Sequence, residues 1–163
     1  MDSRDMVLQA LIKWGIAFEL HAHAPAHTID DCLQMDFISP DTVICKNIFL
    51  CNRQKTQFYL MLLHPNKQFR TAEVSKALGV SRLSFAPDEY LPKMLGLLPG
   101  SVSPLGLVLD KEHQITLICD KKIRDYPRIA FHPCVNTETV IFEKNDFFEK
   151  VLHHIGTAPI WVE

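Results

Sequence analysis

The spacing of apolar residues at the start of the chain predicts a helix, a strand and a second helix. Residues 3–14 carry apolar side chains at mostly helical spacing, and Gly15 follows where a left-handed helix end would lie. Residues 16–23 alternate between apolar and polar side chains, which is typical of a strand. Residues 28–35 predict a short helix with Thr28 at its capped start.

Two apolar, β-prone runs in the middle of the chain predict a hairpin at the centre of a sheet. They span residues 42–50 and 56–63, and a polar segment separates them. Lys46 and Asn47 interrupt the first run. The pattern then predicts a helix over residues 71–78 closed by Gly79, a short strand over 83–86 and a helix over 87–95.

The second half of the chain begins with a loop rich in proline and glycine and continues with short apolar runs. We expect strands over residues 105–109 and 115–119 paired as a hairpin, a short helix or turn over 121–126, strands over 128–131 and 139–142, a helix over 145–155 and a tail from 157. Interleaved strands and helices predict a mixed α/β (α+β) class. We expect a single domain over residues 1–163, with a mixed central β-sheet surrounded by helices.

Composition narrows the class of protein. The 163 residues, 47% hydrophobic and 22% charged, can bury one core without disulfides or metal. Neither a signal peptide nor a membrane span is expected, and five cysteines without a C-x-x-C pair favour free thiols in the cytoplasm. With a net charge of −2, the protein could meet a nucleic acid only through a local basic patch.

Three features are candidates for chemistry. Lys46 on an apolar strand face suggests a pocket floor that meets a phosphate or carboxylate, or a stem that reaches solvent past the sheet edge. The loop over residues 99–104 could aim restricted backbone amides at a carbonyl oxygen or phosphate, or could be a tight turn. His132 and Asn136 follow a predicted strand, where an imidazole could serve as acid, base or donor, or be structural.

Metal and cofactor chemistry find little support. His21, His23 and His27 lack a cysteine or carboxylate at regular ligand spacing. The sequence contains no phosphate-binding loop, no dinucleotide fingerprint and no hydrolase elbow. We therefore expect no metal site and no cofactor.

Three motifs together resemble the YbaK/ProX family of prolyl-tRNA editing domains and their free-standing relatives. They are Lys46-Asn47-Ile48-Phe49-Leu50, the loop Gly96 to Leu107 and His132-Pro133-Cys134-Val135-Asn136. The combination is most similar to free-standing enzymes of the Ala-tRNA(Pro) deacylase type. The resemblance implies a trans-editing hydrolase that cleaves the ester of mischarged tRNA(Pro), most of all Ala-tRNA(Pro). It also implies the tRNA acceptor end as partner, with prolyl-tRNA synthetase as a second candidate.

Ester hydrolysis needs a placed water, donors for the developing oxyanion and a grip on the terminal adenosine. On this basis the predicted catalytic residues are Lys46, Gly100, Ser101 and His132, and the predicted substrate-binding residues are Thr28, Asn47, Val102, Ser103, Pro104 and Asn136. Two alternatives stay open: the same chemistry on Cys-, Ser- or Thr-charged tRNA, and a non-catalytic nucleic-acid-binding or regulatory module.

Overall fold

The computed structural model describes residues 2–26 and 28–163, and its strands form two mixed sheets. The four-stranded sheet has the order β1 (Glu19–Ala22), β8 (Glu138–Glu143), β7 (Arg128–Phe131), β2 (Thr42–Ile44). The five-stranded sheet has the order β5 (Ser84–Phe85), β3 (Lys46–Cys51), β4 (Phe58–Leu63), β6 (Ile115–Asp120), β9 (Ile160–Val162). The predicted α/β class is confirmed, with the strands shared between two sheets rather than gathered in one.

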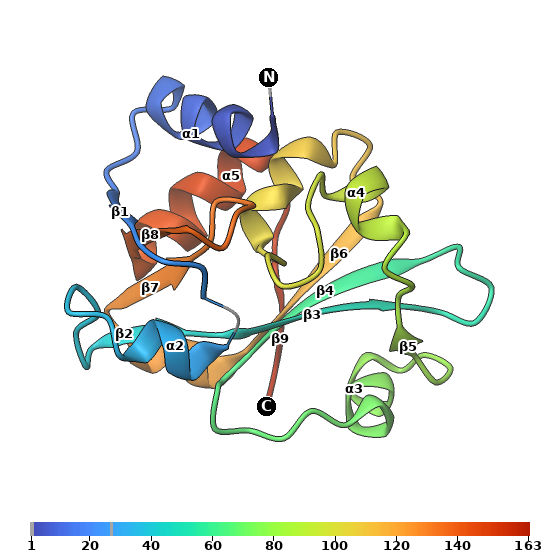
Figure 1. Cartoon of the computed structure of the whole chain (residues 1–163). Helices are drawn as coiled ribbons and strands as arrows, with labels where there is room; N and C mark the ends of the chain where they lie inside the picture. The colour runs from blue at the N-terminus through green and yellow to red at the C-terminus, as the bar shows by residue number, and fades with distance from the viewer. Residues whose placement is uncertain (1, 27) are drawn as a thin grey trace.

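The chain passes from one sheet to the other at Cys45. This residue alone separates β2 from β3, so the two strands follow one another across the molecule (Figure 1). β2 runs parallel to β7, whereas β3 runs antiparallel to β4. The carboxyl ends of the parallel pair therefore meet the start of β3 at this crossing.

Strand β4 is buried on both faces, as a strand in the centre of a sheet should be. Phe58, Leu60 and Leu62 pack in the larger core, while Tyr59 and its alternate neighbours pack in a smaller cluster on the opposite face. The near-continuous apolar sequence of β4 is what two buried faces require. The predicted central hairpin of β3 and β4 is confirmed.

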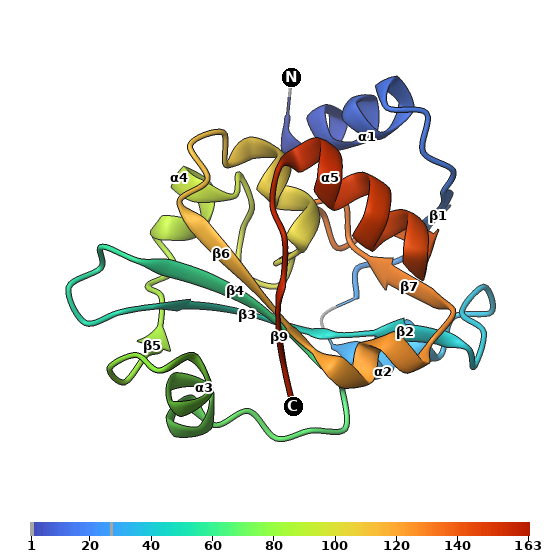
Figure 2. The same ribbon diagram turned by 180° about the vertical axis from the view of Figure 1, so that it is seen from behind.

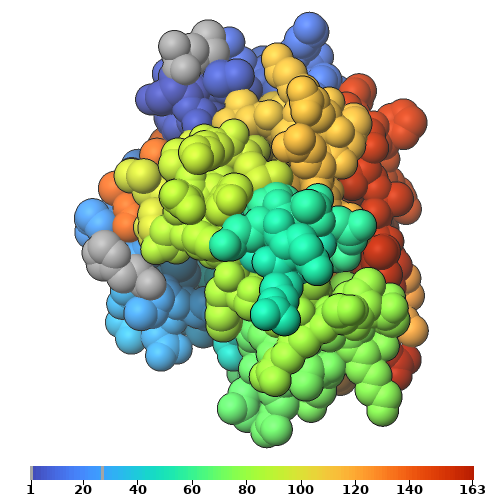
Figure 3. Space-filling model, turned by 90° about the vertical axis from the view of Figure 1, so that its right-hand side faces the viewer, coloured from blue at the N-terminus to red at the C-terminus, as the bar shows by residue number. Residues whose placement is uncertain are grey.

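Helices cover both sheets. They are α1 (Ser3–Lys13), α2 (Ile29–Leu33), α3 (Thr71–Leu78), α4 (Tyr90–Met94), the 3₁₀ helices η1 (Pro104–Leu109) and η2 (Lys121–Asp125), the π-helix η3 (Asp146–Val151) and α5 (Leu152–Ile155). η3 and α5 form one continuous helical segment in front of β7 in Figure 2. In Figure 3 the tip of the β3–β4 hairpin, in teal, lies between the yellow-green segment that contains α4 and the green segment that contains α3. None of the described helices is long and apolar enough to cross a membrane.

Local capping signals in the sequence produced the expected helix ends. Gly15 and Gly79 have φ values of +69° and +68°, the left-handed conformation predicted for the ends of α1 and α3. Thr28 caps α2, and its hydroxyl and backbone amide both exchange hydrogen bonds with Asp31. The helix predicted over residues 87–95 is present but shorter, as α4.

The hairpin predicted from residues 105–109 and 115–119 is wrong. Residues 104–109 form η1, because Ser103 caps the segment and Pro104 occupies its first turn. β6 instead pairs in parallel with β4 and with β9. The predicted tail thus contains an ordered strand, since β9 completes the edge of the five-stranded sheet.

Candidate active site

A cavity of about 200 Å³ lies at the crossing between the two sheets. It is bounded by the ends of β2 and β7, the start of β3, helix α2 and the loop before η1. The lining residues are Ala26, Thr28, Ile29, Cys32, Ile44, Cys45, Lys46, Asn47, Gly100, Val102, Ala130, Phe131, His132 and Thr139. Ligands of open α/β sheets commonly bind beyond the carboxyl ends of parallel strands, which is where this cavity lies.

The predicted site residues divide into two groups. Thr28, Lys46, Asn47, Gly100, Val102 and His132 line the cavity, whereas Ser101, Ser103, Pro104 and Asn136 do not. The first group comes from four separate parts of the chain. The fold therefore brings together Lys46, Asn47 and His132 around the cavity. The rest of the predicted loop lies outside the cavity lining.

Lys46 is half-buried at the first position of β3. Its Nζ donates a 2.6 Å hydrogen bond to the backbone oxygen of Lys67, which lies just beyond the end of β4. By strand alternation its side chain shares a face with Ile48 and Leu50, as predicted. An ammonium has three N–H donors, so this bond leaves two for other acceptors.

Asn47 joins β3 to the loop before η1. Its Nδ2 donates to the backbone oxygen of Val102 at 3.0 Å. Its Oδ1 is buried and has no hydrogen-bond partner among the described residues. A buried, unpaired amide oxygen costs stability, so Asn47 brings an unsatisfied acceptor to the wall of the cavity.

Gly100 has a φ of +89°, a conformation that residues with a Cβ resist. A Cβ at this position would have no heavy atom of the described chain within 4 Å, so it would extend into open space. The amide of Ser101, one of the predicted donors, instead donates to the backbone oxygen of Leu98 at 3.1 Å. The amide-donor hypothesis therefore narrows to Gly100 and Val102, the loop residues that line the cavity.

Ser103 supports the loop from behind. It is fully buried, and its Oγ accepts from the amide of Leu105 at 3.1 Å, which caps η1. Pro104 is buried in the first turn of the same helix. Gly106 lies so close to Leu95 that an added Cβ would be 2.9 Å from its backbone oxygen. These contacts hold the loop against the core rather than against a ligand.

Replacing Ser103 by alanine should therefore weaken the fold more than the reaction. Losing a capping hydroxyl costs about 1 kcal/mol, which urea unfolding would measure. Hydrolysis per folded molecule should stay close to that of the unmodified protein. A Ser103→Ala variant that is stable but inactive would place the hydroxyl in the chemistry and contradict this assignment.

His132 is held in one tautomer. Its Nδ1 lies 2.9 Å from the backbone oxygen of Glu138, and because a carbonyl only accepts, Nδ1 carries the proton. Nε2 lies 3.9 Å from the Sγ of Cys32 on α2. Burial lowers the pKa of His132 below its usual range, despite the opposing hydrogen bond to Glu138. The ring is thus neutral at neutral pH, with the Nε2 lone pair directed to the Cys32 side of the cavity.

The lowered pKa predicts how stability depends on pH. Below about pH 6.5 the unfolded chain takes up a proton that His132 in the folded chain resists, so the free energy of unfolding should fall as the pH falls. The free energy of unfolding stops falling once the pH is below the pKa of His132 in the folded chain. Between the two pKa values it falls by at most about 1.4 kcal/mol per pH unit. Urea unfolding of His132→Gln should lack the part of this pH dependence that comes from His132. His153→Gln, at an exposed position of α5, should retain it; equal profiles for the two variants would contradict the interpretation.

The lining residues that were absent from the predicted site include Cys32 and Thr139. Cys32 faces His132 from α2, and burial raises the pKa of its thiol. Thr139 is buried in β8, where its Oγ1 lies 2.8 Å from Nε2 of His23. The signal for Cys32 was its position four residues after the cap Thr28, on the same face of a short helix.

Asn136, a predicted substrate-binding residue, and His21, which was considered as a metal ligand and not predicted as one, both have structural contacts. The backbone oxygen of Asn136 accepts from the amide of Ala26 at 2.9 Å, which ties the segment before α2 to the loop after β7. His21 stacks on Phe37 with 4.1 Å between ring centroids. His27 lies outside the described residues. Within residues 2–26 and 28–163, no three His, Cys, Asp or Glu side chains are grouped to hold a metal ion.

A second cavity, of about 340 Å³, lies against the same loop and adjoins the first cavity. It shares Asn47, Gly100 and Val102 with the first cavity, and its other walls are mostly apolar. Those walls are Ile48, Phe49, Phe85, Ala86, Asp88, Leu91 and Pro99. Gly100 and Asn47 therefore stand at the boundary of two adjoining spaces.

Comparison with known proteins shows several related chains. The model of the aminoacyl-tRNA editing domain family matches residues 23–150. The prolyl-tRNA editing protein ProX of Acetoanaerobium sticklandii is 30% identical over 158 residues, covering 97% of this chain and 95% of that protein. Prolyl-tRNA synthetase associated domain-containing protein 1 of Danio rerio is 29% identical over 159 residues, covering 94% of this chain and 85% of that protein.

Solved structures share the fold. A crystal structure described as that of a candidate trans-editing enzyme for prolyl tRNA synthetase has a TM-score of 0.74 at 16% identity, covering 100% of this chain and 98% of that chain. The family match spans most of the chain and includes every residue placed here around the two cavities. The chain therefore belongs to the aminoacyl-tRNA editing domain family and is an aminoacyl-tRNA hydrolase.

Proposed function

We propose that this chain is a trans-editing enzyme that hydrolyses mischarged tRNA(Pro), with Ala-tRNA(Pro) as its main substrate. The name of the ProX relative supports prolyl-tRNA editing as the general activity. The observation that carries the proposal is the 200 Å³ cavity in which Lys46, Gly100 and His132 meet. This volume is below the roughly 300 to 1,000 Å³ of common drug-sized ligand pockets, so it suits a small aminoacyl group.

In this proposal the chain binds and orients the ester while a water molecule attacks it. Water adds to the aminoacyl carbonyl, the ester C–O bond breaks, and the released ribose oxygen takes the proton that the attacking water gives up. The amides of Gly100 and Val102 would hold the developing oxyanion. Lys46 would hold the terminal nucleotide through its phosphate or sugar, and Asn47 would orient the adjoining group through its unpaired Oδ1.

Specificity would come from exclusion of larger side chains. A single methylene is worth only about 1 to 3 kcal/mol in an apolar pocket, so the pocket can exclude proline more readily than it can reject a smaller residue. His132, Cys32 and Ile29 border the cavity and would limit its size. The neutral, buried ring of His132 suits this role as a wall of the amino-acid pocket.

The second cavity provides room for the terminal nucleoside. It adjoins the first across Gly100 and Asn47, so a ribose over Gly100 would direct the aminoacyl ester to one side and the base to the other. The aromatic ring of Phe85, 64% exposed, lies on its wall and offers a face for stacking. Stacking of a base on an aromatic ring is worth about 1 to 3 kcal/mol.

Replacing Phe85 by alanine should raise KM about fivefold or more with little change in kcat, since a stacking contact made equally in ground and transition states affects binding alone. Steady-state deacylation would measure both constants. Leu98→Ala is the matched control, because Leu98 is 68% exposed on the adjoining loop but lines neither cavity. Equal effects of the two substitutions would contradict the proposal that the terminal base binds in this cavity.

A deacylation panel tests the proposed function. tRNA(Pro) charged with Ala, Cys, Ser, Thr or Pro would be incubated with the protein, and release of each amino acid compared with the uncatalysed rate. We expect fastest release of alanine and none of proline. Fastest release of Cys, Ser or Thr would identify that charged tRNA, rather than Ala-tRNA(Pro), as the main substrate. Release of no amino acid above the uncatalysed rate would favour a non-catalytic nucleic-acid-binding module.

The proposal includes the acceptor end of tRNA(Pro) as partner and the cytoplasm as compartment. Prolyl-tRNA synthetase is a second proposed partner, supported by the synthetase-associated name of the Danio rerio relative. The 25% identity to a proline–tRNA ligase of Limosilactobacillus fermentum, over 64% of this chain and 18% of that protein, also supports a functional link to the synthetase.

A further inference from the structure

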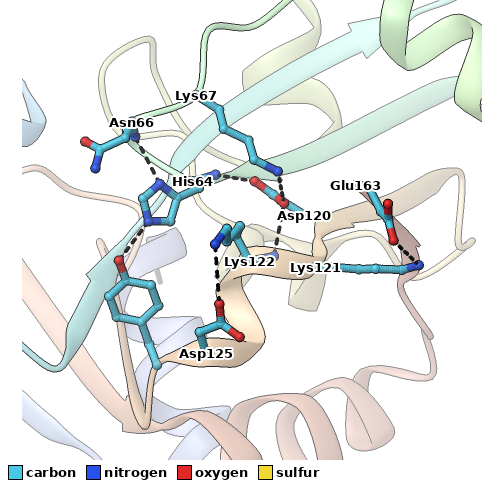
Figure 4. Close-up of polar contacts among 9 residues, drawn as sticks. His64, Asn66, Lys67, Asp120, Lys121, Lys122, Asp125 and Glu163 are labelled. Carbon is cyan, nitrogen blue, oxygen red and sulfur yellow. Dashed lines mark hydrogen bonds and ion pairs between the residues drawn. The ribbon is translucent and has the colours of Figure 1, made fainter.

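A buried carboxylate lies outside both cavities, at the end of β6. Asp120 is 1% exposed, and its Oδ1 accepts from Lys67 Nζ at 2.6 Å and from the amide of Lys122 at 3.1 Å. Its Oδ2 accepts from the amide of His64 at 3.1 Å. Burial by itself raises the pKa of this carboxyl, but the hydrogen bonds lower it below the usual range. Asp120 is therefore an ionised anchor for the segment after β4 (Figure 4).

The segment from His64 to Lys67 is a turn held at several points. The amide of Lys67 donates to the backbone oxygen of His64 at 3.0 Å, and the amide of Asn66 donates to Nδ1 of His64 at 3.1 Å. Because Nδ1 accepts, Nε2 of the neutral ring carries the proton and donates to the hydroxyl of Tyr126 at 2.7 Å. Figure 4 shows the contact between the amide of Asn66 and the imidazole of His64.

The same turn provides the contact of the site lysine. Lys46 Nζ donates to the backbone oxygen of Lys67, and the side chain of Lys67 reaches Asp120 in turn. The two bonds, each 2.6 Å, connect the ammonium of Lys46, a residue that lines the cavity, to the buried carboxylate of Asp120 through Lys67. A long lysine side chain has many rotamers, so a fixed acceptor reduces the entropy lost when substrate binds.

We propose that Asp120 and Lys67 are positioning residues that hold the ammonium of Lys46 at the edge of the active-site cavity. The Asp120–Lys67 ion pair places the Lys67 carbonyl, and this carbonyl directs Lys46 with two N–H donors left for the substrate. This inference rests on the proposed function of Lys46. It assigns a role to a polar cluster that no sequence motif indicated.

A double-mutant cycle tests the proposal through activity. Lys67→Met removes the ammonium but keeps the stem and backbone carbonyl, and we expect kcat/KM to fall about tenfold as Lys46 loses its fixed position. Adding Lys67→Met to Lys46→Ala should cause no further loss, because there is then no ammonium to position. A double variant whose loss is the product of the two single losses would overturn the proposal, as would an unchanged Lys67→Met.

The matched control is another buried carboxylate. Asp110 is 7% exposed and accepts from the amides of Gln114 and Ile115 at 3.0 and 2.9 Å, so it also secures a turn. Among the described residues, its hydrogen bonds lead to none that lines either cavity. Asp110→Asn should lower stability and leave kcat/KM unchanged, whereas Asp120→Asn should lower both.

A measurement on the free protein separates this inference from the proposed function. In NMR spectra of protein with labelled lysine side chains, the Lys46 signal is identified by its loss in Lys46→Ala. It should move toward the values of a solvated lysine in Lys67→Met and stay in place in Asp110→Asn. An unmoved signal in Lys67→Met overturns the positioning role, whereas a deacylation panel without release of any amino acid overturns the proposed function alone.

Discussion

Gly100→Val should reduce deacylation about 100-fold or more while the protein remains folded. Gly100 borders both cavities, and a side chain there would enter the space proposed for the terminal ribose. No heavy atom of the described chain lies within 4 Å of the added Cβ, so the substitution does not clash with the core. Misplacement of a substrate by about 1 Å can cost 100-fold in rate. Single-turnover hydrolysis of charged tRNA would measure the loss.

Backbone strain must be separated from obstruction of the site. The φ of +89° makes valine costly by about 1 to 2 kcal/mol at this position. Gly79→Val is the matched control, since Gly79 has a φ of +68°, equal freedom from nearby atoms in the described chain and a position at the end of α3. Both variants should unfold at similarly lower urea concentrations, and only Gly100→Val should lose activity. Equal activities would show that the loop does not border the substrate.

Lys46→Ala should lower kcat/KM about 10- to 100-fold, mainly by raising KM. Lys46 is the one lysine or arginine among the described residues that line the two cavities. A hydrogen bond to a charged group contributes about 1.5 to 3 kcal/mol, and each 1.4 kcal/mol corresponds to a factor of ten. Steady-state deacylation with increasing concentrations of charged tRNA would measure both constants.

The control for Lys46 is a lysine with the same charge in a different place. Lys76 is exposed on α3, away from both cavities, and Lys76→Ala changes the net charge equally. An equal loss in the two variants would mean that overall charge, rather than a contact in the site, attracts the tRNA. An unimpaired Lys46→Ala would remove this residue from the site.

The capped and amphipathic segments could be predicted from sequence because their signals are local. The cap of α2 at Thr28, the end of α3 at Gly79 and the two buried faces of β4 all depend on neighbours within a few residues. The hairpin of residues 105–109 could not be predicted correctly. A short apolar run is compatible with a strand or a buried helix. The features that favour η1, the cap at Ser103 and Pro104 in the first turn, belong to the loop before the run and lie outside the apolar pattern on which the strand was predicted.

The sequence indicated the unusual polar residues of the candidate site, but not all of the residues that line the cavity around them. An unusual lysine and amide in an apolar strand, and a histidine after another strand, indicated Lys46, Asn47 and His132. Thr139 could not be found because nothing in its local sequence marks it as a neighbour of His132. The helical spacing of Cys32 from Thr28 indicated a shared helix face, but not that this face lies against His132. Their place follows from how α2 and β8 pack against the end of β7.

The sequence by itself determined the helix ends, the central hairpin and the polar residues out of place in apolar strands. These depend on backbone conformation and on side-chain burial, which nearby residues dictate. Only the tertiary structure decided that β2 and β3 belong to different sheets, that Gly100 separates two cavities and that Asp120 is linked to Lys46 through Lys67. Such features depend on contacts between segments far apart in the chain, and their energies appear only when the whole core is packed.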